Sequence, residues 1–209
     1  MASQARSSSW KEDLDEIDPM ETWPDTMAYL SMSPQSLPYT NRYEYIVCAA
    51  VMRPGLVLVN DDNITADNPK SSTTRPALLL IQRATTQKTG ALNWELPGGR
   101  IENSNPTLEA ALRNRVPWET GLTVKNILRS ANHKPLVRQD RYQVRSRVLL
   151  TFLVTVEEAE VTLVEDKHCD WRWVECAKDA EDLQMSKAGR KALGRALEVA
   201  RKVANARTG

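Results

Sequence analysis

The chain has 209 residues, of which 41% are hydrophobic and 26% are charged, a balance typical of a globular protein. Its formal net charge is +1, so we expect neither nucleic acid nor a membrane surface as a partner. The sequence has no apolar run of the roughly 20 residues that span a bilayer, and its N-terminus lacks the apolar core of a secretory signal. The cysteines (Cys48, Cys169 and Cys176) follow no disulfide or metal-binding spacing, so we expect reduced thiols in a cytoplasmic protein.

Residues 1–40 are predicted to form a partly irregular N-terminal arm. Prolines recur through this segment and exclude a long helix; they are Pro19, Pro24, Pro34 and Pro38. Apolar residues such as Trp10 and Tyr29 indicate that the arm packs against another part of the chain. The remainder, residues 41–209, is predicted to form one domain.

Runs of β-forming apolar residues predict a sheet in that domain. We expect strands at 44–53, 77–84, 94–97, 122–131 and 142–157, with 55–60 extending the first. Residues 61–76 are predicted to be a polar loop, 159–175 a strand, loop and strand, and 179–183 a turn or short helix.

Two segments have helical periodicity. Residues 106–116 place Leu108, Leu112 and Arg115 on one face, with Asn105 as the expected N-cap and Pro106 at the first position. Pro117 is expected to kink or end this helix near Val116. Residues 186–206 predict an amphipathic helix capped by Ser186. A sheet covered by helices gives a mixed α+β sandwich.

The segment WELPGGRIENSNPTLEAALRNRVPWETGL has a distinctive beginning and end. The two ends of this segment resemble the two ends of the Nudix box: Trp94 to Gly99 with Glu102 match the front, and Glu119 to Leu122 match the back. Many fungal members of that superfamily have similar WELPGG and ETGL stretches. The strands at 44–53 and 77–84 and the stretch EDKHCDWRWVE also resemble this superfamily, so the similarity covers about residues 42–205. The resemblance implies a Nudix-like α/β/α sandwich with a mixed central sheet and an N-terminal extension.

The middle of the box departs from the family pattern. Family members hold a divalent ion, usually Mg²⁺, through glutamates on one face of the box helix, and those positions align with Arg115, Trp118 and Glu119. Three glutamates would give this helix face a charge of −3, whereas Arg115, Trp118 and Glu119 sum to zero. The lost attraction weakens the binding of a divalent ion by several kcal/mol. We expect no metal cofactor; the alternative is Mg²⁺ on a rebuilt site of Glu102, Glu119 and Glu165.

Glu119, Arg115 and His168 are the candidate catalytic residues, because a carboxylate, a guanidinium and an imidazole can move protons and stabilise charge. A surface position in a loop is an equally simple interpretation of His168. The candidate substrate-binding residues are Trp118, Glu102, Gly98, Gly99, Trp94 and Trp171. Core packing is the simpler interpretation of Trp94.

Three functions stay open on the sequence. The first is metal-independent acid/base chemistry, of cyclisation or isomerisation type, on a small organic substrate of specialised metabolism. The second is Mg²⁺-dependent hydrolysis of a diphosphate-containing small molecule. The third is a Nudix-like protein that binds a ligand or partner without catalysis. A homodimer is compatible with each of them.

Overall fold

The computed structural model describes residues 25–38, 40, 43–53, 75–132, 136–138, 146–157 and 160–206. The expected strand at 55–60, most of the polar loop and the arm before residue 25 lie outside the described residues. None of the helices in the described part of the chain has the length and apolar character needed to cross a membrane.

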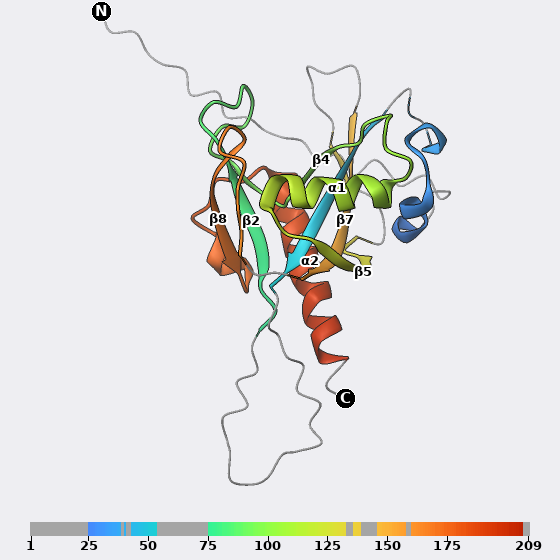
Figure 1. Ribbon diagram of the computed structural model, residues 1–209. Coiled ribbons are helices and arrows are strands. Elements are labelled where there is room, and N and C mark those ends of the chain that lie inside the picture. The colour runs from blue at the N-terminus through green and yellow to red at the C-terminus, as the bar shows by residue number, and fades with distance from the viewer. Residues whose placement is uncertain are drawn as a thin grey trace, which may run out of the picture.

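A mixed sheet forms the centre of the protein (Figure 1). Strands β1 (Tyr43–Met52) and β7 (Ser146–Val156) pair in parallel from Tyr43↔Ser146 to Met52↔Thr155. The other pairings are antiparallel. Strands β2 (Leu78–Arg83) and β4 (Gly98–Arg100) pair with β1, and β3 (Trp94–Glu95) and β8 (His168–Val174) pair with β2. Strands β5 (Val124–Ser130) and β6 (Leu136–Arg138) pair with β7. The predicted mixed sheet is confirmed.

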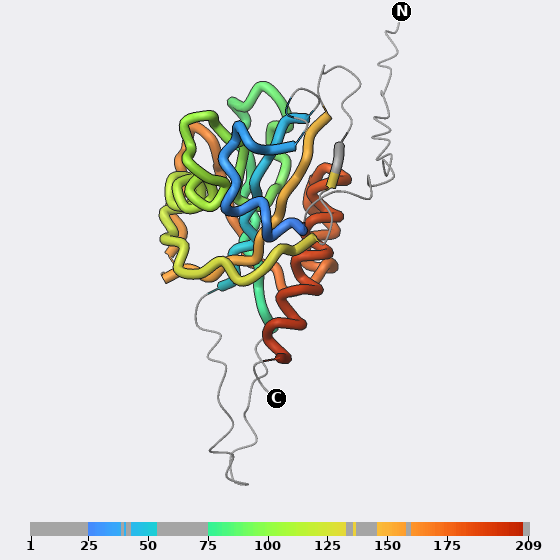
Figure 2. Tube along the Cα trace, turned by 90° about the vertical axis from the view of Figure 1, so that its right-hand side faces the viewer, coloured from blue at the N-terminus to red at the C-terminus, as the bar shows by residue number. Residues whose placement is uncertain are grey.

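Two helices cover opposite faces of this sheet, as Figure 2 shows. Alternate residues of β1 face opposite ways, so Val47 packs in the cluster that contains Leu112 of α1 (Leu108–Thr120). Its neighbour Cys48 lies in the cluster that contains Leu193 of α2 (Lys187–Asn205). The two apolar clusters lie on either side of the sheet and confirm the α/β/α sandwich.

The described part of the arm consists of two short 3-10 helices, η1 (Thr26–Ser31) and η2 (Pro34–Ser36). Tyr29 is fully buried in the cluster on the α1 side, and the Leu108 N–H donates to the Met32 carbonyl at 3.0 Å. This part of the arm therefore packs against the domain as predicted and joins the N-terminus of α1.

Helix α1 differs from its prediction at both ends. Thr107, not Asn105, is the N-cap, and its hydroxyl accepts from the Ala110 N–H at 3.1 Å. The helix also runs through Pro117 to Thr120, so the expected end near Val116 is wrong. Gly121, in the left-handed conformation at φ 71°, caps the helix by donating its N–H to the Pro117 carbonyl.

Tertiary packing explains why the proline is tolerated. Val116 is fully buried against the sheet and Glu119 is 2% exposed, so packing holds the last turn in place although Pro117 supplies no N–H. The Thr120 hydroxyl adds a bond to the Val116 carbonyl at 2.7 Å. These contacts outweigh the local preference of the sequence.

The other predicted elements are confirmed with smaller changes. Ser186 caps α2 by accepting from the Gly189 N–H at 3.0 Å. The strand expected to begin at residue 159 is wrong for residues 160–163, which form no strand, although the Thr162 N–H donates to the Thr120 carbonyl. The short helix η3 (Ala177–Ala180) begins two residues before the predicted turn at Asp179.

We predict that Pro117→Ala stabilises the protein by about 2 kcal/mol. The alanine regains a helical N–H bond and loses the ring clash, worth ~3 kcal/mol, while the more flexible unfolded chain offsets ~1 kcal/mol of the gain. Urea unfolding of both proteins measures the difference. Asn114→Ala, an exposed position of the same helix that already has an N–H, is the control and should change stability by only a few tenths of a kcal/mol. An unchanged or lower stability of Pro117→Ala contradicts the prediction.

Candidate functional site

A cavity of about 840 Å³ lies beside the end of α1 and the start of α2. Its walls come from β1, β4, the last turns of α1, the start of β8 and the first turns of α2. A volume of this order is typical of small-molecule sites. The cavity brings together residues that are far apart in the chain, from Ile46 to Ala192.

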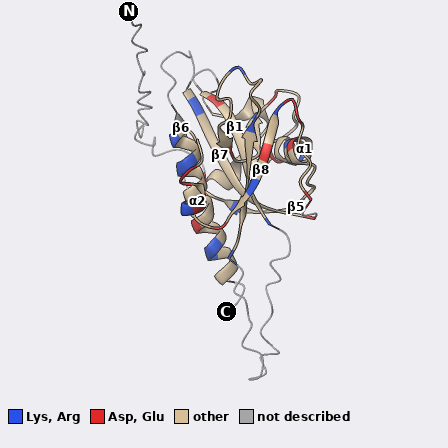
Figure 3. Ribbon diagram, turned by 90° about the vertical axis from the view of Figure 1, so that its left-hand side faces the viewer, with Lys and Arg blue, Asp and Glu red and all other residues tan. Residues whose placement is uncertain are grey.

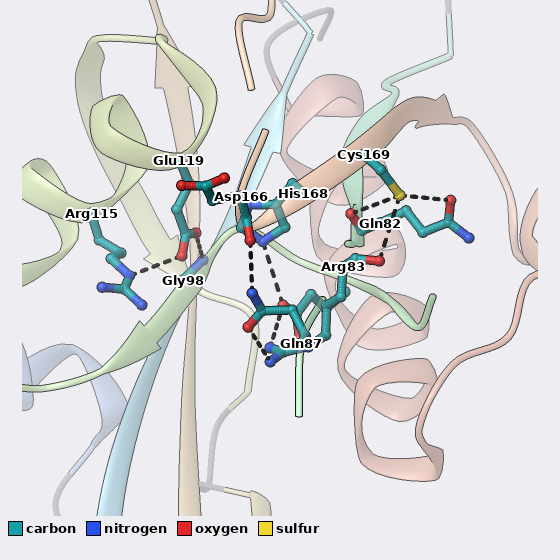
Figure 4. A network of polar contacts seen from close by, with 10 residues as sticks. Gln82, Arg83, Gln87, Gly98, Arg115, Glu119, Asp166, His168 and Cys169 are labelled. Carbon is teal, nitrogen blue, oxygen red and sulfur yellow. Dashed lines mark hydrogen bonds and ion pairs between the residues drawn. The ribbon is translucent and has the colours of Figure 1, made fainter. Parts of the chain in front are cut away.

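Glu119 is a buried ionisable residue in the cavity wall. Its side chain is 3% exposed, and one carboxylate oxygen, Oε1, accepts from the Arg115 Nε at 2.9 Å. The other oxygen, Oε2, accepts from the Gly98 N–H at 2.6 Å, as Figure 4 shows. Burial raises the pKa of Glu119 from its ordinary 4.5 to about 7, against the lowering effects of Arg115 and the Gly98 N–H. The carboxyl group can therefore gain or lose a proton near neutral pH.

The glycine pair makes this arrangement sterically accessible. A side-chain carbon on Gly98, where φ is 151°, would lie 2.2 Å from the Val47 carbonyl oxygen, so only glycine lets β4 approach β1 here. A side-chain carbon on Gly99 would lie 2.5 Å from Nη2 of Arg115. Gly99 thus leaves the space in which the Arg115 guanidinium lies.

Trp118 completes a group of three residues on the last turns of α1. The Arg115 guanidinium carbon lies 4.8 Å from the centre of the Trp118 ring, a cation–π distance. The indole is 46% exposed and lines the cavity. Arg115 is therefore held between a carboxylate and an aromatic ring. The structure brings Arg115, Trp118 and Glu119 together because α1 continues through Pro117, where the sequence predicts a kink or an end.

His168 lies in the cavity wall at the start of β8. Its side chain is 5% exposed, so the alternative of a surface loop position is wrong. Nε2 lies 3.7 Å from Oε1 of Glu95, which also pairs with Arg83 at 3.0 Å. The other ring nitrogen, Nδ1, is buried without a hydrogen-bond partner in the part of the chain that the structure describes. Glu95 and Arg83 were not predicted as site residues, because the β2–β3 register that aligns these strands is a long-range feature.

The remaining candidates divide into two groups. Glu102 lines the cavity together with Gly98 and Gly99. Trp94 and Trp171 do not line it: Trp94 is buried in the apolar cluster on the α2 side and lies under Arg172, with 5.6 Å from guanidinium carbon to ring centre. Trp171 is 41% exposed on β8, outside the cavity.

The carboxylates do not gather into a metal site. Within the described ranges, no group of three or more His, Cys, Asp or Glu side chains is placed to hold a metal ion. Both oxygens of Glu119 already accept from donors, and Glu165 is exposed and does not line the cavity. Magnesium needs several oxygen ligands in octahedral geometry. The described residues therefore do not fit the magnesium site that the resemblance implies.

The cavity lining is instead rich in cations. Five cationic side chains line it, which outnumber its three carboxylates. The cations are Arg83, Arg100, Arg115, Arg147 and Lys167, and the carboxylates are Glu95, Glu102 and Glu119. An excess of positive charge in a concave site attracts anions. The arrangement favours an anionic small molecule over a bare metal ion.

We predict that Glu119 makes the protein less stable as the pH rises. The folded chain holds one more proton than the unfolded chain between pH 4.5 and about 7, so the stability contributed by protonated Glu119 is present below pH 4.5 and lost as the pH rises through about 7. The difference in unfolding free energy between the wild type and Glu119→Gln should therefore fall by about 1.4 kcal/mol per pH unit in this window. Urea unfolding across this range measures it. Glu109→Gln, on the exposed side of α1, is the control, and its difference in unfolding free energy from the wild type should not change with pH. If the unfolding free energies of the wild type and Glu119→Gln change equally with pH, the prediction is contradicted.

The comparisons with known proteins agree with this fold. The model of the NUDIX domain matches residues 64–193, more than half of the chain. No curated protein matches the sequence.

Solved structures with the same fold include three Nudix proteins of low sequence identity. A MutT Nudix hydrolase from Burkholderia pseudomallei is 22% identical over 73% of this chain and 96% of its own, with a TM-score of 0.52. The MutT protein from Methanosarcina mazei is 18% identical over 76% of this chain and 95% of its own, at 0.54. The Nudix domain of NrtR from Shewanella oneidensis, solved with ADP-ribose, is 13% identical over 85% of this chain and 99% of its own, at 0.55. With the family model and the α/β/α sandwich in agreement, the chain belongs to the Nudix superfamily.

Proposed function

We propose that this protein is a Nudix-fold enzyme that uses Glu119 as a general acid and base on a small anionic organic molecule, without a divalent metal ion. The reaction class is proton transfer leading to cyclisation or isomerisation. The observation that carries the proposal is a buried carboxyl group, held by two donors, in the wall of a cavity lined by an excess of cations.

Glu119 has the properties that acid/base catalysis needs. A catalytic pKa near the working pH gives a useful population of both protonation states, and burial places the pKa of Glu119 at about 7. Each oxygen accepts one hydrogen bond, from the Gly98 N–H or from Arg115, and keeps a second lone pair. The carboxyl group can thus take a proton from the substrate and return it while its position stays unchanged.

Arg115 and His168 extend this chemistry. Arg115 uses Nε for Glu119, which leaves the other guanidinium nitrogens for an oxygen that gains negative charge during the reaction. His168 lies in the same cavity wall with Glu95 beside its Nε2, and within the described part of the chain its Nδ1 is buried without a hydrogen-bond partner. We assign His168 the role of the second proton-transfer group.

The exposed indole of Trp118 supports an organic substrate. It presents a flat apolar surface at the cavity, and Arg115 packs over its ring. A planar or apolar part of the substrate can stack on this surface while the charged part meets the arginines. This division of the cavity distinguishes an organic acid or organic phosphate from a simple inorganic anion.

Binding of an anionic ligand without turnover is the second candidate function. The positive charge of the lining favours it directly, and the fold neighbour from Shewanella oneidensis was solved with ADP-ribose. Metal-dependent hydrolysis of a diphosphate compound has less support, although the fold neighbour from Burkholderia pseudomallei is a Nudix hydrolase, because the described residues gather no carboxylate cluster. The three functions differ in what they require of Glu119 and of magnesium.

Hydrogen exchange tests the proposed proton transfer. The full-length protein is incubated in D₂O with EDTA and a panel of organic carboxylates and organic phosphates, and NMR follows deuterium incorporation or conversion of each compound. We expect at least one compound to react, with a pH profile that inflects near the pKa of Glu119, about 7. Glu119→Gln should abolish the reaction because an amide cannot exchange the proton.

One control variant and three diagnostic outcomes separate the candidates. Glu109→Gln removes a carboxylate from the same helix outside the cavity and should retain full activity. Binding of a panel compound without exchange or conversion favours the second candidate. Release of phosphate from a diphosphate compound that requires added Mg²⁺ contradicts the proposal and favours hydrolysis. Full activity of Glu119→Gln removes Glu119 from the mechanism.

A further inference from the structure

A second feature of the cavity lies apart from Glu119 and is formed by two arginines that share one carboxylate. Nε of Arg100 lies 3.0 Å from Oε1 of Glu44, and Nε of Arg147 lies 2.9 Å from Oε2 of the same residue. Arg100 and Arg147 both line the cavity. The group carries a net charge of +1, because two guanidinium groups face one carboxylate.

Strand register places these three residues on the same face of the sheet. Glu44 of β1 pairs with Arg147 of β7, and Ile46, two residues further along β1, pairs with Arg100 of β4. Side chains two residues apart on a strand point to the same face. The arginines therefore approach Glu44 from the strands on either side of β1, on the face that α2 covers.

Among the residues that the structure describes, no partner occupies the remaining nitrogens of either arginine. Each arginine uses Nε for Glu44, and neither has a further hydrogen bond or ion pair to another residue in the described part of the chain. Arg100 has a side chain that is 70% exposed, whereas Arg147, at 29%, is partly enclosed. A guanidinium held at Nε presents its Nη groups as a fork that fits the oxygens of a carboxylate or phosphate.

Stability alone does not account for the second arginine. One arginine neutralises Glu44, and an exposed ion pair adds little to stability, typically 0 to about 1 kcal/mol. The second arginine leaves one uncompensated positive charge, because the three other cations of the cavity, Arg83, Arg115 and Lys167, are already matched by three carboxylates. This excess is unfavourable without an anion and favourable with one.

We infer that Arg100 and Arg147, oriented by Glu44, form an oxyanion subsite that binds a carboxylate or phosphate group of the ligand. The inference rests on the proposed function only for the position of the reacting centre; binding of the anion does not depend on proton transfer. Neither arginine is part of the segment from α1 that carries Arg115 and Glu119.

The oxyanion subsite and Glu119 both adjoin β4. The Gly98 N–H holds Glu119, and Arg100 lies two residues further along the same strand. Two residues of extended strand span about 7 Å. Arg100 lies on the face that α2 covers, whereas Glu119 reaches β4 from α1 on the other face, so the two groups contact different parts of a ligand. Small organic acids and organic phosphates are the class of ligand that this charge distribution fits.

Calorimetric titration of the full-length protein tests the subsite. The probes are inorganic phosphate, pyrophosphate and succinate, so that the separate arms distinguish phosphate from carboxylate recognition. We expect saturable binding of at least one probe. Arg147→Gln and Arg100→Gln should each weaken it by about tenfold, which is the usual effect of losing one charge-assisted contact.

Matched variants keep the result interpretable. Arg129→Gln removes an exposed arginine on β5 outside the cavity and should bind like the wild type, which controls for the change in net charge. Arg100 is largely exposed, so Arg100→Gln should fold normally even if Arg147→Gln does not. Absence of saturable binding of every probe overturns the inference, and so does wild-type affinity in Arg100→Gln.

Glu119→Gln separates this inference from the proposed function. The variant should retain the affinity for the anionic probe while losing proton exchange. Anion binding that depends on Arg100 and Arg147, in a protein with no exchange activity, supports the subsite and removes the proposed function. Exchange activity that is unaffected by Arg100→Gln and Arg147→Gln supports the function and removes the subsite.

Discussion

The contact on which the site depends joins the carboxylate of Glu119 to the backbone N–H of Gly98. It fastens the last turn of α1 to β4, and β4 in turn pairs with the central strand β1. One buried side chain therefore sets the distance between a helix and the edge of the cavity. Arg115 completes the arrangement because it binds the other oxygen and lies over Gly99, where any larger residue would displace it. The two glycines and the pair of α1 side chains form one structural unit.

That unit requires α1 to continue through Pro117. Arg115 and Glu119 are one helical turn apart and meet only if the residues between them are helical. The sequence signals a break at this point, and the structure overrides it through the burial of Val116 and Glu119 and the left-handed cap at Gly121. A local preference that is overridden next to a functional site is a common sign that the tertiary structure fixes the site geometry. Figure 3 shows α1 and the acidic and basic residues of this region on the side of the sheet opposite α2.

The parts of the structure that follow from local patterns could be predicted, and those that depend on strand register could not. Apolar periodicity predicts the sheet and the helix α2 that Ser186 caps. Arg115, Trp118 and Glu119 share a helix face only because α1 continues through Pro117, against the break that the sequence predicts. The burial of His168 and its position beside Glu95 depend on how β2 aligns with both β3 and β8. The Glu44 group depends on three strands from distant parts of the chain. A shift of one residue in either register would turn these side chains to the opposite face.

A metal ligand and a general acid make opposite demands on Glu119. A bound Mg²⁺ places two positive charges next to the carboxylate, which stabilises its ionised form and lowers its pKa. Burial without such an ion does the reverse and raises the pKa of Glu119 to about 7. The same side chain cannot hold a divalent ion and exchange a proton at neutral pH. Under the proposed function, the arginines supply the positive charge that an anionic ligand needs. They lower the pKa of Glu119 less than a divalent ion would, because the nearest arginine, Arg115, carries a single charge and is partly exposed to solvent. Guanidinium groups hold a phosphate or carboxylate but do not activate water as a metal ion does. Under the proposed function, this balance of charges suits anion binding and proton transfer rather than hydrolysis.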